Sequence, residues 1–207
     1  MGMHLALDDL RSDQAFTVIS VATPVTENRV QARTIIRIAL RDTLAAFLGQ
    51  SAESILLGSR PGQPVQLDPT WGGMHLSLSH MPGLSVAAIS RVSAVGVDLM
   101  QVDRVVIETS DWRQMVRDYL GPSASDLLHN TPPAQRPGVF AEAWTRLESC
   151  LKCMGLPLTE WNPRLAQQLL NCHVMGLDLP ESCCGSIAML SHELKLHLPP
   201  AVLKPVK

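Results

Sequence analysis

Hydrophobic patterns along the chain predict an α+β protein made of two similar halves. A long helical pattern is followed by three short strands, then by helices, and finally by three further strand patterns. Short turns join the first strands, which favours antiparallel pairing because parallel crossovers need a dozen or more residues. The chain has 207 residues, enough for one large domain or two small ones. We expect the halves to cover residues 1–103 and 104–207, with a cleft between them.

The composition is typical of a soluble globular protein, with 46% hydrophobic and 17% charged residues. The 17 basic and 19 acidic residues give a net charge of −2, so the chain has no general electrostatic footprint for nucleic acid. Any anion site must therefore be a local cluster. No apolar run approaches the ~20 residues that cross a bilayer, and residues 1–14 are too polar for a secretion signal. We expect no nucleic-acid or membrane partner and a cytoplasmic location.

The first helix is expected over residues 29–48, with Gly49 as its natural C-terminal stop. One face of this helix is apolar. Its members are Ala32, Ile35, Ile36, Ala39, Leu40, Leu44, Phe47 and Leu48. On the other side Arg33, Arg37 and Arg41 recur every four residues. These arginines form either a solvated face or an anion-binding stripe.

Three strands are expected at residues 74–78, 85–90 and 95–99, forming an antiparallel meander. A helical region follows at about 109–120. The next stretch, residues 129–138, contains three prolines in "HNTPPAQRPG", and we expect it to be an irregular loop.

The strongest helical pattern covers residues 138–154 and ends at Gly155. Its core stripe consists of Phe140, Trp144, Leu147, Leu151 and Met154. Thr145, Glu148 and Lys152 follow the same spacing on a neighbouring stripe. The tail then returns to strand patterns, which we place at residues 169–179, 186–191 and 193–198.

The five cysteines all lie in the last third of the chain. An odd number without an export signal favours reduced thiols. Cys150 and Cys153 form a CxxC pair, and Cys172-His173 with Cys183-Cys184 offer further zinc ligands. Because the CxxC lies inside a helix and adjacent cysteines chelate poorly, we favour ordinary buried or half-buried thiols over zinc.

Three charged residues are the candidates for chemistry. Asp98 ends a short apolar strand and is either a buried structural aspartate or half of a metal site. Glu148 and Lys152, taken alone, are an ordinary helical ion pair worth about 0.2–0.5 kcal/mol. His80 lies beside a Pro-Gly turn, where a surface or half-buried histidine is the simpler interpretation.

The spacing of these residues carries more information than each residue alone. "VGVD" at residues 95–98 is followed after 45 residues by "WTRLESCLK" at residues 144–152. Together they resemble the signature of the 4′-phosphopantetheinyl transferase superfamily. The positions that fit its pattern are Val95, Gly96, Val97, Asp98, Trp144, Thr145, Arg146, Glu148, Ser149 and Lys152.

The resemblance covers roughly residues 30–158. "LSLSHMPG" at 76–83 looks like the family's Phe-Asn-Ile-Ser-His-Ser block, and "PGQPV" at 61–65 stands where longer members have Gly-Lys-Pro. The strand-rich tail suits the longer type, which activates peptide and polyketide synthetases. That type implies a pseudo-twofold monomer with the active-site cleft between its two α+β halves.

The resemblance implies transfer of phosphopantetheine from coenzyme A to a serine of an apo acyl or peptidyl carrier protein. Asp98 and Glu148 would hold Mg²⁺, with Mn²⁺ as an alternative. Glu148 would also be the base for the serine hydroxyl, directly or through water. Lys152 would neutralise charge on the leaving phosphate. The processes implied are polyketide, nonribosomal peptide or fatty acid biosynthesis.

Coenzyme A has its own expected contacts under this resemblance. Ser79 and His80 would meet its phosphates, together with Arg33 from the N-terminal helix and Lys152. Gln63 and Pro64 stand in the Gly-Lys-Pro block and are expected to face coenzyme A as well.

Several positions depart from the family pattern. Met100 stands where longer members carry a second strand acid, Gln63 and Leu147 replace two lysines, and Ser77 replaces an asparagine. Mg²⁺ retains waters readily, so a two-carboxylate site remains workable. The alternative is a non-catalytic member that binds carrier protein or coenzyme A for another purpose.

Overall fold

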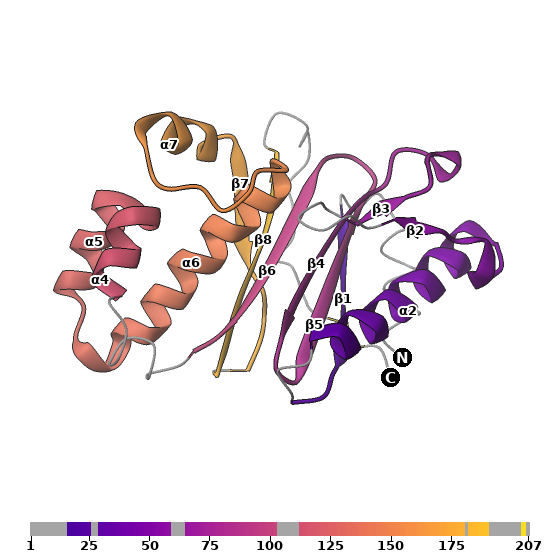
Figure 1. The fold of residues 1–207 in the computed structure, drawn as a ribbon, viewed down its shortest axis with the longest axis horizontal. Coiled ribbons are helices and arrows are strands. Elements are labelled where there is room, and N and C mark those ends of the chain that lie inside the picture. The colour runs from indigo at the N-terminus through magenta and orange to yellow at the C-terminus, as the bar shows by residue number, and fades with distance from the viewer. Residues whose placement is uncertain are drawn as a thin grey trace.

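The protein has a mixed α+β fold, seen in a computed structural model that describes residues 16–25, 29–58, 65–102, 112–180, 182–190 and 204–205. Figure 1 shows its layers: helix α2 (Arg29–Leu48) at one end, the strands in the middle, and helix α6 (Arg136–Cys153) beyond them. Helices α4 (Trp112–Met115), α5 (Gly121–Asn130) and α7 (Pro163–Leu169) lie outside α6.

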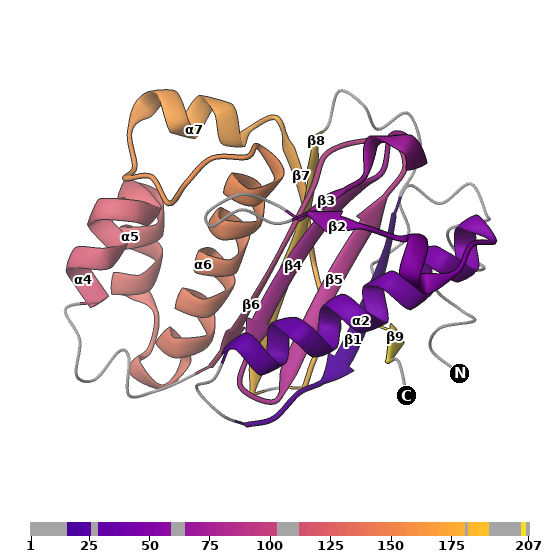
Figure 2. The same ribbon diagram turned by 45° about the vertical axis from the view of Figure 1, so that its right-hand side comes forward.

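The first sheet has the strand order β4-β5-β1-β9. Its strands are β1 (Phe16–Ala22), β4 (His75–Met81), β5 (Leu84–Ser90) and β9 (Lys204–Pro205). Strand β5 is antiparallel to both β4 and β1, whereas β9 runs parallel to β1. Helix α2 lies across one face of this sheet (Figure 2), where its apolar stripe meets the alternate residues of the strands. The buried residues of this core are Ile19, Ile36, Leu40, Leu44, Ala45, Ile55, Leu76, Ala87 and Ile89.

The second sheet has the order β6-β8-β7 and is antiparallel throughout. Its strands are β6 (Val95–Gln101), β7 (Cys172–Gly176) and β8 (Cys183–Leu190). Helix α6 packs against β6 and β8. The opposite face packs against the first sheet through an apolar core whose buried members are Phe16, Val18, Val86, Ala88, Val95, Val97, Leu99, Ile187 and Met189. The two sheets therefore share one core between the layers formed by α2 and α6.

Short elements complete the fold. A two-stranded sheet joins β2 (Leu57–Gly58) to β3 (Gln66–Leu67). Single 3-10 turns cover Ala52–Ser54, Pro69–Trp71 and Pro133–Gln135, and a π-helical turn covers Val116–Leu120 between α4 and α5. No helix among the described residues is long and apolar enough to span a membrane.

Several sequence predictions are confirmed. Helix α2 has the predicted bounds, α6 differs from the expected 138–154 by two residues or fewer, and β4 and β5 pair antiparallel as expected. The core stripe of α6 is also confirmed, since its members pack into two apolar clusters with α5 and α7. All five cysteines are free thiols.

Other predictions are wrong. Strand β6 does not continue a meander with β5 but pairs with β8 in the other sheet. The irregular loop expected at 129–138 is largely helical, since α5 runs to Asn130 and α6 starts at Arg136. Prolines are tolerated there because they occupy the first turns of the following helices. Residues 163–169 form helix α7 before the expected strand, and strand β1 was not predicted.

The remaining predictions concern how the chain is divided. Because β6 joins β7 and β8, the sheets separate between residues 90 and 95, ahead of the predicted boundary at 103. Residue 103 and the strand expected at 193–198 lie outside the described residues. The two-half division, its pseudo-twofold symmetry and the cleft stay predictions.

Candidate active site

Asp98 lies in the middle of β6, not at its end as the sequence predicted, because the strand continues to Gln101. Its side chain points away from the shared core, on the same face as Gly96, and toward α6. A Cβ atom on Gly96 would lie 1.9 Å from the Ser149 carbonyl oxygen and 2.5 Å from the Cys153 nitrogen. The missing side chain of Gly96 therefore lets the α6 backbone rest directly on β6, which brings Lys152 within reach of Asp98.

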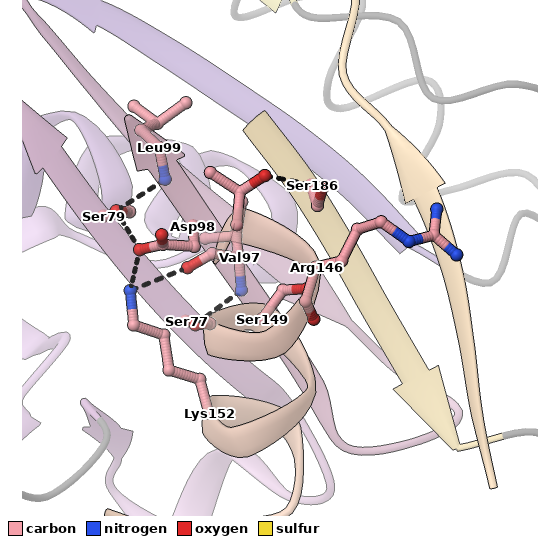
Figure 3. A network of polar contacts seen from close by, with 10 residues as sticks. Ser77, Ser79, Val97, Asp98, Leu99, Arg146, Ser149, Lys152 and Ser186 are labelled. Carbon is pink, nitrogen blue, oxygen red and sulfur yellow. Dashed lines mark hydrogen bonds and ion pairs between the residues drawn. The ribbon is translucent and has the colours of Figure 1, made fainter. Parts of the chain in front are cut away.

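Lys152 and Asp98 form an ion pair across this contact (Figure 3). The Lys152 Nζ atom donates to Asp98 Oδ1 at 2.5 Å and to the Val97 carbonyl at 3.1 Å. The two side chains are 31% and 11% exposed, so the pair is partly shielded from water. The lysine therefore has its charge held beside the carboxylate while part of its surface remains open to a ligand.

Strand β4 contacts the same group from the other sheet. The Ser79 hydroxyl donates to Asp98 Oδ1 at 3.0 Å and accepts the Leu99 backbone N–H at 3.0 Å. Ser77, two residues earlier, accepts the Val97 N–H at 3.0 Å. The edges of the two sheets are thus joined through serine side chains, as Figure 3 shows.

Glu148 is half-buried near this pair. Burial raises the pKa of its carboxyl, the negative charge of Asp98 raises that pKa further, and Lys152 opposes both effects. Asp98 and Glu148 are therefore close enough to repel one another. Such a pair of carboxylates is suited to share a cation or a proton.

His80 extends the site toward α2. Its Nδ1 lies 3.0 Å from the Ser85 hydroxyl, its register partner on β5. Burial, together with the positive charges of Arg33, Lys152 and Arg29, lowers the pKa of His80 to about 4. His80 is therefore neutral at pH 7. The same charges show that α2 and α6 bring cationic groups close to His80 of β4, an arrangement suited to an anion.

The arginine stripe of α2 is divided by the structure. Arg29 and Arg33 act on His80, whereas the Arg37 guanidinium donates to the Leu57 carbonyl and turns to the β2 side. Arg29 was missed by the sequence reasoning, although it precedes Arg33 by one helical turn and the spacing alone would have found it. Gln63 and Pro64 lie outside the described residues.

Two of the departures from the family pattern, Met100 and Leu147, are packed against apolar side chains. Met100 lies on the face of β6 that carries Asp98 but packs against the cluster of Trp112, Val116, Leu128 and Phe140. Leu147 is 6% exposed and packs with Leu151 and Leu165. Each side chain therefore makes an apolar contact where the family pattern has a charge. Met100 of β6 packs against α4, α5 and α6, and Leu147 of α6 packs against α7.

The carboxylates fit a hard divalent cation in donor type. Among the described residues no group of three or more His, Cys, Asp or Glu side chains could hold a metal. Mg²⁺ is commonly bound through one or two carboxylates, with substrate phosphates and waters as its other ligands. A cation between Asp98 and Glu148 would relieve the repulsion between them. The two carboxylates therefore fit a Mg²⁺ site completed by water and substrate, and not a site made of protein ligands alone.

Two carboxylates and a lysine thus lie beside further cationic groups, a combination suited to phosphate esters. Residues 94–178 match the family model of the 4′-phosphopantetheinyl transferase superfamily. This segment is therefore a domain of that superfamily, and the resemblance drawn from residues 95–98 and 144–152 is confirmed. In general terms the match indicates a transferase that uses coenzyme A and acts on carrier proteins. No curated protein matches the chain.

The matched segment contains Asp98, Glu148 and Lys152 but leaves α2, β4 and β5 outside. The match therefore does not cover Arg33, Ser79 and His80, whose coenzyme A roles stay predictions.

Proposed function

We propose that this protein transfers the 4′-phosphopantetheine arm of coenzyme A to a serine of an apo acyl or peptidyl carrier protein, in a Mg²⁺-dependent reaction. One observation carries the proposal. Asp98 and Lys152 form a hydrogen-bonded pair with Glu148 beside it, at the edge of the cationic group around His80. A pyrophosphate needs cations along its length and carboxylates where a metal binds, and this arrangement supplies both.

Glu148 is the proposed general base. The serine hydroxyl of the carrier gives its proton to the Glu148 carboxylate, directly or through water, as its oxygen attacks the phosphorus next to the pantetheine arm. Because burial and Asp98 raise the pKa of Glu148, this carboxylate is a better proton acceptor near neutral pH than an exposed glutamate.

Lys152 is proposed to stabilise the leaving group. As the pyrophosphate bond breaks, negative charge builds up on adenosine 3′,5′-bisphosphate, and the partly exposed Lys152 ammonium is the nearest described cation to Asp98. Asp98 and Glu148 would hold Mg²⁺, or Mn²⁺ in its place. The bound ion would polarise the pyrophosphate oxygens.

Arg33, His80 and Lys152 are proposed to bind the phosphates of coenzyme A. A neutral His80 can donate a hydrogen bond to an anion without the cost of burying a further charge. Arg29 joins this set because its charge lowers the pKa of His80 and it lies on α2, as Arg33 does. Gln63 and Pro64 are kept as coenzyme A contacts on the family resemblance alone.

The wider proposals follow from the same resemblance. We place the protein with the longer, synthetase-activating type, as a cytoplasmic monomer of two α+β halves with the active site in the cleft between them. Carrier proteins of polyketide, nonribosomal peptide or fatty acid synthesis are the expected partners.

A second function is favoured by one observation. Met100 is packed among aromatic and aliphatic side chains where a further acid would stand. A protein with this weakened site could bind carrier protein or coenzyme A without transferring the arm.

Intact mass spectrometry separates the two functions. The protein is incubated with coenzyme A, Mg²⁺ and a panel of apo acyl, peptidyl and aryl carrier proteins. Addition of the phosphopantetheine arm supports the transferase. No addition to any carrier, with coenzyme A still bound in a calorimetric titration, would establish the binding function instead.

A further inference from the structure

Two buried serines alternate along β4 and face β6. Ser77 and Ser79 are 6% and 5% exposed, and each accepts one backbone N–H of β6 at 3.0 Å. They lie two residues apart and therefore on the same face of the strand. Both serines thus make the same contact where the edges of the two sheets meet.

One contact distinguishes them. The Ser79 hydroxyl also donates to Asp98 Oδ1 at 3.0 Å, the oxygen that accepts Lys152 Nζ at 2.5 Å. A serine hydroxyl has a single proton to donate. Since that proton is directed at Asp98, it is not available to a phosphate oxygen, although the sequence pattern assigns Ser79 to coenzyme A.

The backbone contact orients this donor. The Leu99 N–H of β6 donates to a lone pair of Ser79 Oγ and so fixes the position of this oxygen. The Ser79 proton then points at the carboxylate of Asp98, the residue before Leu99. Ser79 and Lys152 both engage Oδ1. Among the described residues no hydrogen bond engages Oδ2, so this second oxygen is left for a metal.

We propose that Ser79 is a positioning residue that orients the Asp98 carboxylate for its metal, and not a ligand of coenzyme A. This inference rests on the proposed function, because it assumes that Asp98 holds Mg²⁺. Removal of a group that orients a metal-binding carboxylate typically lowers metal affinity or activity by about 10–100-fold.

The structure supplies a matched control for the test. Ser79→Ala and Ser77→Ala each remove one acceptor for a β6 backbone N–H, so each should lower Tm. Only Ser79→Ala removes the donor to Asp98. With coenzyme A present, we expect Ser79→Ala to bind Mn²⁺ about 10–100-fold more weakly than Ser77→Ala, measured from the EPR signal of the free ion.

The kinetics provide a second readout. In Ser79→Ala the Mg²⁺ concentration that gives half the maximal transfer rate should rise by a similar factor, while the KM for coenzyme A stays within about twofold of the Ser77→Ala value. Ser79→Thr keeps the hydroxyl and should recover metal affinity. Ser79→Cys fills the same space with a weak donor and should bind metal as weakly as Ser79→Ala. It replaces the alanine variant in the test if Ser79→Ala folds poorly.

Two results would overturn the role of Ser79. One is equal Mn²⁺ affinity in the two alanine variants. The other is a raised KM for coenzyme A in Ser79→Ala with unchanged metal affinity, which would make Ser79 a phosphate contact. If the wild-type protein binds Mn²⁺ but transfers nothing, the proposed function fails while the serine comparison still stands. If it binds no Mn²⁺, both are wrong.

Discussion

The two sides of helix α6 differ in chemistry although they belong to one element. The side facing β6 presents Lys152 and Glu148 to Asp98, with Lys152 partly exposed and hydrogen-bonded and Glu148 half-buried. The side facing β7 and β8 presents Cys150 and Cys153, both buried, to an apolar cluster.

This difference shows which of two sequence motifs carries chemistry. The charged residues Asp98, Glu148 and Lys152 of the family signature lie on the polar side, near the edges where the two sheets meet. The CxxC pair maps to the packed side, where Cys172 of β7 joins Cys150 and Cys153. Changes on the polar side should therefore alter transfer, and changes on the packed side should alter stability or thiol reactivity.

The largest effect is expected for Asp98→Ala, which should abolish transfer. The substitution removes a proposed metal ligand and leaves the Lys152 ammonium without its carboxylate partner. Transfer to an apo carrier is measured by intact mass. Cys150→Ala is the control from the other side of the helix, and it should keep its rate per folded molecule. Wild-type transfer by Asp98→Ala would refute the metal site.

Gly96→Ala should produce the largest loss of stability. Its Cβ would lie 1.9 Å from the Ser149 carbonyl oxygen, so α6 must move away from β6. Overpacking of this kind costs about 1–3 kcal/mol, and each kcal/mol lowers Tm by about 2–4 °C in a protein of this size.

Gly138→Ala is the control for this change, because a Cβ on Gly138 in α6 meets nothing within 4 Å. That variant should gain about 0.5–1 kcal/mol from the better helix former. Thermal unfolding of both variants tests the contact. An unchanged Tm in Gly96→Ala would mean that the two elements are not in direct contact.

Much of this fold could be predicted because the information is local. The bounds of α2 follow from a helical period and Gly49, and the strand residues of β4 and β5 follow from short apolar runs between turns. Helix α7 was missed despite a usable signal, since the Asn162 side chain caps it and Pro163 begins it.

Pairing between distant strands could not be predicted. Residues 95–99 have the same apolar pattern in either sheet, and only contact with β8, some 90 residues later, decides where β6 belongs. The direction of the Ser79 hydroxyl depends on that pairing, because its partners lie on β6. The sequence motif therefore predicted that Ser79 belongs to the site, but not that its hydroxyl donates to Asp98.

Met100→Glu tests whether the missing acid can be restored. The new carboxylate would lie on the Asp98 face of β6 and should lower the Mg²⁺ concentration needed for half-maximal transfer. It also removes an apolar contact with the Trp112 cluster, at a cost of about 1–3 kcal/mol. Met100→Gln carries the same cost without the charge. Equal Mg²⁺ dependence in the two variants would place residue 100 outside the metal site.

Glu148→Gln should change stability in a pH-dependent way. Because the folded protein raises the pKa of Glu148, it binds this proton more tightly than the unfolded chain does, and ionisation destabilises the fold as pH rises. The variant should therefore match wild type well below the ordinary carboxyl pKa and exceed it in Tm above the raised pKa. Unfolding scans from pH 4 to pH 8 without metal measure this. An equal Tm across the range would mean that the folded protein does not raise the pKa of Glu148.

The smallest effect concerns the packed side of α6. A hydrogen bond from Cys150 lowers the pKa of the half-buried Cys172, whereas the same hydrogen bond and burial raise the pKa of Cys150. Since the thiolate is the nucleophile, limiting iodoacetamide near pH 7 should alkylate Cys172 before the two helix thiols. Peptide mass mapping gives the order of modification, and Cys172→Ala should remove the fastest phase while leaving transfer within about twofold of wild type. First modification at Cys150 would mean that the thiolate resides on the helix, and a large loss of transfer in Cys172→Ala would mean that the two sides of α6 are not independent.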